Sequence, residues 1–231
     1  LVHPVPATYG IGGDENYYFS HMLNCLYDCR YCFLQGMYPS AHYLLFVNYE
    51  DFFEEIKKVS DQKPEKPSWF FSGYDCDSLA LEKLTGFAQA ALSFFSNHKQ
   101  THLEFRTKSV ATQVLQKMNP LSNAVVAFSF TPDEVSQQIE HGVPPVSSRI
   151  KAMKKLAEIG WKLGLRIDPL IHCHDFEHRY RKLFEEIFKA VPEESIHSVS
   201  LGAFRMPSGF FKKIEKLYPE ERLLAGNFQS K

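Results

Sequence analysis

The alternation of strand-like and helix-like segments is the feature that most constrains the fold of this chain. Apolar or β-branched runs typical of buried strands occupy residues 17–23, 68–72, 102–107, 124–131, 163–171 and 197–204. Amphipathic helical patterns follow them at residues 49–59, 78–95, 110–118, 147–159, 177–190 and 209–217. A strand followed by a helix, repeated about six times, indicates parallel βα units. We therefore expect an α/β fold, a partial parallel (β/α)6 barrel of the TIM type, with its chemistry at the carboxyl ends of the strands.

Length and composition fit one such barrel in a reducing compartment. The chain has 231 residues, of which 44% are hydrophobic, and we expect a single domain over residues 1–231 that is truncated at both termini. No apolar run reaches membrane-spanning length, so no membrane partner is expected. Five cysteines form a poor disulfide framework, and free thiols suit the cytoplasm. The GIGG segment at residues 10–13 lacks the spacing of a dinucleotide fingerprint and is expected to form a turn.

Three clustered cysteines follow the first predicted strand, in a loop expected at the functional end of the barrel. Cys25, Cys29 and Cys32 form a C-x3-C-x2-C pattern. Three thiolates can hold three irons of a cubane cluster, and the fourth iron then needs a ligand from outside the protein. The alternative is a zinc site in which Cys29 and Cys32 are completed by residues from the segment 172–174 (His-Cys-His).

The cysteine pattern, with Tyr31 directly before the third cysteine, resembles that of radical S-adenosylmethionine enzymes. The resemblance implies a barrel of the radical SAM kind, in which Cys25, Cys29 and Cys32 bind a 4Fe–4S cluster and S-adenosyl-L-methionine chelates the open iron. It further implies reductive cleavage of this cofactor to a 5′-deoxyadenosyl radical that abstracts a substrate hydrogen. A reductant such as flavodoxin or ferredoxin would supply the electron. Tyr31 is expected to pack near the cofactor's adenine.

A closer resemblance extends from about Tyr17 to Tyr218. The segments CRYCFLQ, FRTKS, AFSFTPDEV, EHGVPPVSSRI and GWKLGLRIDPLI occur in the order and spacing of the spore photoproduct lyase family. This resemblance implies a lyase that repairs a thymine lesion, with damaged DNA as its partner. By position, Lys108 and Ser129 correspond to polar residues near the cofactor in that family. Both also fall at predicted strand ends, where a lysine could pair with a carboxylate and a serine with a ribose.

The sequence departs from that family at positions that matter for hydrogen transfer. Where the family has a hydrogen-donating cysteine after the second strand, this chain has Tyr74, and Cys76 lies two residues further on. Both are therefore candidate catalytic residues. Phe33 replaces a tyrosine after the third cluster cysteine, and a phenyl ring has no O–H to give up. RNA, a peptide or a small molecule are thus alternative substrates, and a zinc-containing nucleic-acid-binding module without enzymatic activity is a second alternative.

Three further residues are candidate cofactor contacts. Ser72 and Gly73 begin the turn after the second strand, where radical SAM enzymes place a glycine-rich turn that meets the cofactor's amino group. Arg166 and Asp168 alternate on the fifth strand and so share a face, from which they are expected to hold a carboxylate. A structural ion pair between them is the alternative reading.

Overall fold

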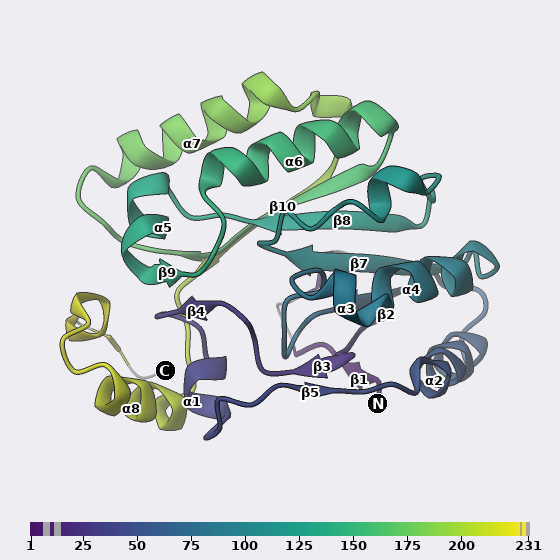
Figure 1. The fold of residues 1–231 in the computed structure, drawn as a ribbon, viewed down its shortest axis with the longest axis horizontal. Coiled ribbons are helices and arrows are strands. Elements are labelled where there is room, and N and C mark those ends of the chain that lie inside the picture. Colours follow the sequence, from purple (N-terminus) through teal and green to yellow (C-terminus); the bar gives the residue numbers. More distant parts are fainter. Residues whose placement is uncertain (7–9, 12–14, 227, 230–231) are drawn as a thin grey trace.

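The computed structural model describes residues 1–6, 10–11, 15–226 and 228–229, and its described part is built on a curled seven-stranded sheet (Figure 1). The turn expected at residues 10–13 therefore lies partly outside the described residues. The strands of the sheet follow in the order β1 (His3–Pro4), β2 (Glu15–Phe19), β6 (Ser68–Ser72), β7 (Thr101–Thr107), β8 (Ala124–Ser129), β10 (Lys162–Leu170) and β11 (Ile196–Ala203). From β2 to β11 every neighbouring pair is parallel, and β1 adds an antiparallel edge. The predicted partial parallel barrel is confirmed.

Helices flank the outer face of this sheet. Figure 1 shows α5 to α7 along one half of the sheet, α2 to α4 beside the other half, and α1 and α8 near one end. The helices are α1 (Leu34–Met37), α2 (Tyr49–Asp61), α3 (Glu82–Thr85), α4 (Phe87–Ser96), α5 (Asp133–Ile139), α6 (Val146–Ile159), α7 (Phe176–Ala190) and α8 (Ser208–Leu217). Among the described helices, none combines the length and apolarity needed to cross a membrane.

Alternation along the strands separates an apolar face from a polar one. Phe70, Phe105 and Leu165 are fully buried in the main core that the sheet forms with the helices. Their neighbours along the strands point to the opposite, concave face. Glu104 and Arg166 lie on this inner face, where a direct ion pair joins them across the intervening strand. The barrel therefore keeps its charged groups inside the curl, below the carboxyl ends of the strands.

Some predicted elements differ in extent from those observed. The predicted helix over residues 78–95 is divided into α3 and α4 by Gly86, which takes a left-handed conformation with φ of 61°. Over residues 110–118 only a 3₁₀ turn forms, at Leu115–Lys117. There the Ser109 side chain accepts a hydrogen bond from the Ala111 N–H, a local contact that competes with helix formation. The predicted strand over residues 17–23 ends at Phe19.

The cysteine segment is held from two sides. The short strand β4 (Asp28–Cys29) pairs with β9 (Glu140–His141), and β3 (Met22–Leu23) pairs with β5 (Leu44–Leu45) before it. On the other side α1 packs against α8 so closely that a Cβ on Gly36 would lie 2.7 Å from the carbonyl oxygen of Phe210. The fold thus fixes the cysteine loop between the barrel and its last helix.

Candidate functional site

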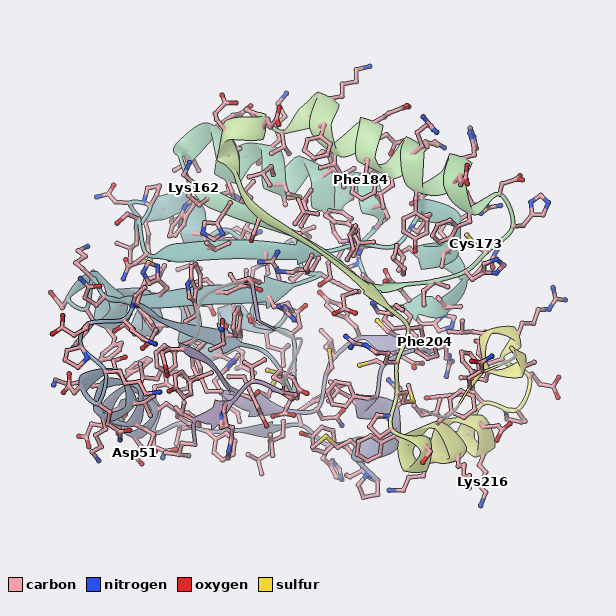
Figure 2. All side chains as sticks on the ribbon, turned by 180° about the vertical axis from the view of Figure 1, so that it is seen from behind. Asp51, Lys162, Cys173, Phe184, Phe204 and Lys216 are labelled. Atoms are coloured by element: carbon pink, nitrogen blue, oxygen red, sulfur yellow. The ribbon has the colours of Figure 1, made fainter. Side chains whose placement is uncertain are left out.

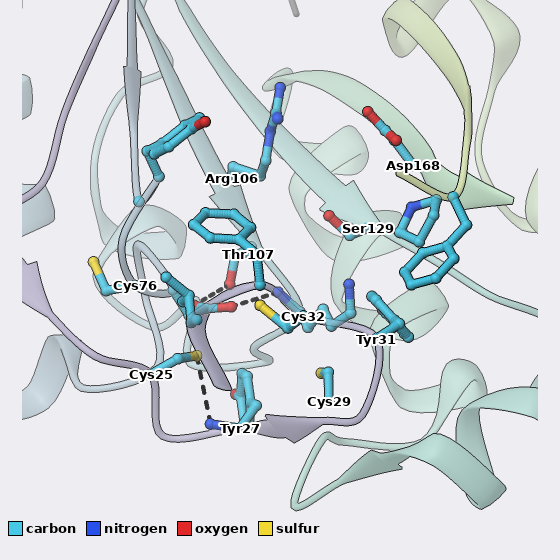
Figure 3. A pocket seen from close by; sticks show the side chains of 18 of the residues that line it. Cys25, Tyr27, Cys29, Tyr31, Cys32, Cys76, Arg106, Thr107, Ser129 and Asp168 are labelled. Atoms are coloured by element: carbon cyan, nitrogen blue, oxygen red, sulfur yellow. Dashed lines mark hydrogen bonds between the residues drawn. The ribbon is translucent and has the colours of Figure 1, made fainter. Parts of the chain in front are cut away.

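A cavity of about 200 Å³ opens at the carboxyl ends of the strands, where barrel folds place their chemistry (Figure 3). The cysteine loop forms one wall of this cavity. The turn after β6 and the ends of β7, β8, β10 and β11 supply the remaining lining residues. One pocket thus collects residues that are as far as 180 positions apart, from Cys25 to Arg205.

All three predicted cluster ligands line this cavity. Cys29 is buried, while Cys25 and Cys32 are half-buried. The Cys32 N–H donates to the carbonyl oxygen of Cys29 at 2.9 Å, and the Tyr27 N–H donates to Cys25 Sγ at 3.5 Å. These bonds make the loop turn so that its sulfurs face a common space (Figure 3).

The cysteine side chains are protonated thiols in the absence of a metal. Burial raises the pKa of Cys25 to about 12, with a smaller contribution from the negative charge of Asp77. Burial likewise raises the pKa values of Cys29 and Cys32. A metal that binds here must displace these protons, as metals generally do at thiol sites.

The donor set fits a cubane cluster better than a single metal ion. Within the described residues, no three His, Cys, Asp or Glu side chains surround one common metal position. In a cubane each thiolate binds a different iron, so the sulfurs need not converge on one point. The zinc alternative also receives no support from the segment 172–174, which lines a separate open depression. In Figure 2 Cys173 lies beside the loop that leads into α7.

Tyr31 and Lys108 are joined through one buried carboxylate. The Tyr31 hydroxyl donates to Glu140 Oε1 at 2.5 Å, and Lys108 Nζ lies 3.8 Å from the same oxygen. The ammonium of Lys108 is also 5.6 Å from the centre of the Tyr31 ring. Burial alone would raise the pKa of Glu140, but the charges of Lys108 and Arg149 outweigh burial and lower it. The carboxylate is therefore ionised, and it holds both residues at the cavity wall.

The turn after β6 places Gly73 on the cavity and Ser72 away from it. Gly73 has φ of 78°, and a Cβ there would lie 2.5 Å from Ser78 Oγ. The Ser72 hydroxyl instead donates to the carbonyl oxygen of Glu104 at 3.1 Å and lies 2.8 Å from Ser78 Oγ. The structure thus corrects the expectation of direct cofactor contact for Ser72, because its buried hydroxyl is engaged behind the turn.

Replacing Gly73 with alanine should destabilise the protein and distort this turn. A non-glycine residue in a left-handed conformation costs on the order of 1–3 kcal/mol, and the added methyl group would also clash with Ser78. Urea denaturation should show this loss. Gly209→Ala is the matched control, because a Cβ at Gly209 meets nothing within 4 Å. Equal stability of the two variants would contradict the strained turn.

Of the two remaining predicted cofactor contacts, Ser129 lines the cavity and Arg166 does not. Ser129 ends β8 and lines the cavity, and its contact with a cofactor stays a prediction. Arg166 does not line it; its guanidinium contacts Glu104 at 2.5 and 3.1 Å and donates to Ser198 Oγ at 3.0 Å. The expectation that Arg166 binds the cofactor is corrected to a buried structural ion pair, and its partner is Glu104 rather than Asp168.

Both candidate hydrogen donors line the cavity. Cys76 is buried, and its Sγ lies 4.0 Å from His21 Nδ1. Tyr74 is half-buried and stacks on Tyr18 with ring centres 4.1 Å apart. Its ring also lies 5.6 Å from Phe33. Burial raises the pKa of Cys76 well above its usual range, so this side chain keeps its S–H.

Arg106 reaches the cavity although sequence reasoning did not assign it there, and two acidic residues, Asp77 and Asp168, also line it. Arg106 and Asp168 line it from β7 and β10. Asp77 also lines it, and its carboxylate accepts from the N–H groups of Leu79 at 2.9 Å and Lys108 at 2.7 Å. For Arg106 the available signal was its position two residues after Glu104, which places both on the inner face of β7.

Comparisons with known proteins agree with this geometry. A family model described as spore photoproduct lyase matches residues 14–230. The chain is 28% identical over 202 residues to spore photoproduct lyase of Bacillus subtilis (strain 168), and 25% identical over 202 residues to that of Geobacillus sp. (strain Y412MC61). Each alignment covers 86% of this chain and 59% of the relative, so the chain spans less than two thirds of these proteins.

Solved structures of spore photoproduct lyase share the fold. A mutant with bound AdoMet and dinucleoside spore photoproduct superposes with a TM-score of 0.81 at 24% identity, covering 89% of this chain and 62% of that one. A complex with dinucleoside spore photoproduct gives a TM-score of 0.81 at 21% identity, covering 93% of this chain and 66% of that one. Because the family model matches nearly the whole sequence, this chain belongs to the spore photoproduct lyase family of the radical S-adenosylmethionine superfamily.

Proposed function

We propose that this chain is the radical S-adenosylmethionine domain of a lyase that repairs a thymine lesion in DNA. The observation that carries the proposal is the placement of three cysteine thiols on one cavity, together with Tyr31, Lys108 and other polar residues, in a chain of this family. A solved relative carries AdoMet and dinucleoside spore photoproduct, which supports the same two ligands for this chain. The single-domain organisation and a cytoplasmic location are parts of this proposal.

In the proposed mechanism the residues of this chain bind the cluster, orient the cofactor and shield the radical from water. Cys25, Cys29 and Cys32 would hold a 4Fe–4S cluster through three thiolates. When bound, the cluster and S-adenosylmethionine supply an electron and a carbon radical that takes a hydrogen atom from the substrate. Lys108 offers an ammonium to the cofactor's carboxylate, and Ser129 offers a hydroxyl to its ribose.

Other residues that line the cavity let the cofactor approach the main chain closely and exclude water. Gly73 exposes its main chain to the cavity because it carries no side chain. Tyr31, Leu34 and Phe204 line the cavity with apolar surface, which limits the access of water to a reactive radical.

Cys76 is the hydrogen donor that we favour over Tyr74. Donation breaks the S–H bond of Cys76 and forms a C–H bond on the substrate radical, which leaves a thiyl radical on the protein. The thiol is available because burial keeps Cys76 protonated at the cavity wall. Tyr74 lines the same cavity from the turn after β6, where its ring would shield the radical.

Cys76→Ala should therefore change the product distribution more than Tyr74→Phe does. Without the thiol the substrate radical persists and is quenched by other donors, so we expect less repaired product and more by-product. Chromatography of the products from a dinucleotide lesion measures both yields. Unchanged yield and distribution in both variants would exclude either residue as donor.

Deuterium transfer tests the proposed substrate. With a lesion deuterated at the abstracted position, label should appear in 5′-deoxyadenosine from the reduced, reconstituted protein. Cofactor cleavage without label transfer would instead favour an RNA, peptide or small-molecule substrate. Activity with reduced flavodoxin or ferredoxin in place of dithionite would identify a class of electron donor.

The zinc-binding alternative is separated by metal analysis. Anaerobically purified protein should be brown, with iron and sulfide, and should bleach on reduction with dithionite. Colourless protein with one zinc per chain would favour the nucleic-acid-binding module.

A further inference from the structure

Glu140 is a buried carboxylate whose two oxygens face different parts of the molecule. Its Oε2 accepts hydrogen bonds from Ser136 Oγ at 2.7 Å and from Arg149 Nη2 at 3.0 Å. Its Oε1 accepts from the Tyr31 hydroxyl and lies 3.8 Å from Lys108 Nζ. One oxygen is therefore anchored to α5 and α6, and the other is presented to two residues of the cavity wall.

The anchor side of this carboxylate is rigid. The side chains of Glu140 and Arg149 are both 0% exposed. Arg149 also donates through Nη1 to the carbonyl oxygen of Ser129 at 2.8 Å. The position of Glu140 is consequently set by the barrel framework.

The main chain of the same segment holds the cysteine loop. Glu140 lies opposite Cys29 in the β4–β9 pair, and the Arg30 N–H donates to the carbonyl oxygen of Ile139 at 2.8 Å. Backbone and side chain of Glu140 therefore act on the same stretch, from Cys29 to Tyr31. Main-chain and side-chain contacts together constrain this stretch more than an isolated salt bridge would.

We propose that Glu140 is a positioning residue for the cofactor site, one that acts through Tyr31 and Lys108. This inference rests on the proposed function. Lysine has a flexible four-carbon stem, and the ion pair with Glu140 confines its ammonium to one wall of the cavity. The hydrogen bond from Tyr31 fixes the plane of a ring that also lines the cavity. Glu140 thus prepares a cation and an aromatic surface for the carboxylate and the adenine of the cofactor.

The test uses two variants and two matched controls. Glu140→Gln removes the charge but keeps an acceptor, and Tyr31→Phe removes only the O–H. Glu82→Gln is the control for loss of a buried carboxylate, because Glu82 is buried outside the cavity lining. Tyr49→Phe is the control for loss of a phenol, because Tyr49 bonds the carbonyl oxygen of Thr85 at 3.0 Å and does not line the cavity.

Two readouts separate positioning from general stability. The first readout is a titration of the reduced cluster with S-adenosylmethionine, followed by EPR in samples of equal iron content. The quantity compared is the S-adenosylmethionine concentration at which the spectral change is half complete. Loss of a residue that orients a metal site typically costs about 10- to 100-fold, and we expect a rise of this size for both variants and wild-type values for both controls. The second is amide hydrogen exchange of residues 28–34 in the metal-free protein, which should quicken in the two variants only.

Failure of the proposed function and failure of the role of Glu140 give different results. Wild-type protein without any cofactor-dependent spectral change would overturn the proposed function and this inference with it. A normal wild-type response that is unchanged in Glu140→Gln and Tyr31→Phe would overturn this inference alone. If Glu140→Gln does not fold, the same two measurements on Tyr31→Phe decide.

Discussion

Replacing Cys25, Cys29 or Cys32 with alanine, one at a time, is expected to abolish cofactor cleavage. Each thiol lines the cavity, and each would bind a different iron, so the loss of one leaves an iron without its protein ligand. The loss of activity should be larger than the loss of about 10- to 100-fold that is typical when a residue that only orients a metal site is removed. Iron and sulfide content, together with 5′-deoxyadenosine formed per hour, measure the effect.

Cys173→Ala is the matched control for these three variants. Cys173 is half-buried but lines a different depression, so its removal should leave iron content and cofactor cleavage at wild-type levels. A variant at Cys29 that still holds a full cluster and cleaves the cofactor would refute the assigned ligand set.

Removing the carboxylate of Glu104 should have the largest effect on stability. Glu104 lies inside the barrel between Arg106 and Arg166, at 3.0 and 2.5 Å. Breaking a buried ion pair by removing one partner costs about 3–5 kcal/mol, because the other charge stays buried without its counterion. Glu104→Ala should therefore shift the urea midpoint strongly at pH 7. Glu54→Ala, which breaks an exposed pair with Lys58, should cost at most about 1 kcal/mol.

The effect at Glu104 should depend on pH in a defined direction. Burial alone would raise the pKa of Glu104, but Arg106 and Arg166 outweigh burial and lower it below the ordinary 4.5. A lowered pKa in the folded state adds stability above the unfolded value, and this stability is lost as pH falls through the folded value. The gap between wild type and Glu104→Ala should thus be full near pH 7 and shrink below about pH 4.5. A gap that widens on acidification would contradict the ion-pair account.

The barrel was accessible from sequence because its strands carry a strong local signal. β7 and β8 are dense in residues that suit a buried strand, and their limits match the predicted ranges within a few residues. The break at Gly86 was not accessible, because a single glycine is compatible with a continuous helix until the packing around it is known. The short pair β4–β9 joins residues more than 100 positions apart and leaves no periodic pattern.

The site was predicted in part, for a similar reason. The family resemblance, together with their places at strand ends and in a turn, indicated Lys108, Ser129 and Gly73, which all line the cavity. Alternation placed Arg166 on the correct face but could not tell how deep in the barrel it lies. Its depth follows from space left by small neighbours, since a Cβ on Gly164 would lie 2.8 Å from the Arg166 guanidinium. Contacts between distant strands, such as that of Arg166 with Glu104, are set by tertiary packing alone.

In the proposed site, three protein thiolates leave one iron open for the cofactor. The most direct measurement is the Mössbauer spectrum of the reconstituted cluster, recorded before and after addition of S-adenosylmethionine. One iron in four should change its isomer shift and quadrupole splitting when the cofactor is added, and Cys76→Ala should give the same spectrum. Four irons that are all unaffected by the cofactor, or a spectrum that changes in Cys76→Ala because Cys76 is a fourth ligand, would contradict this ligand set.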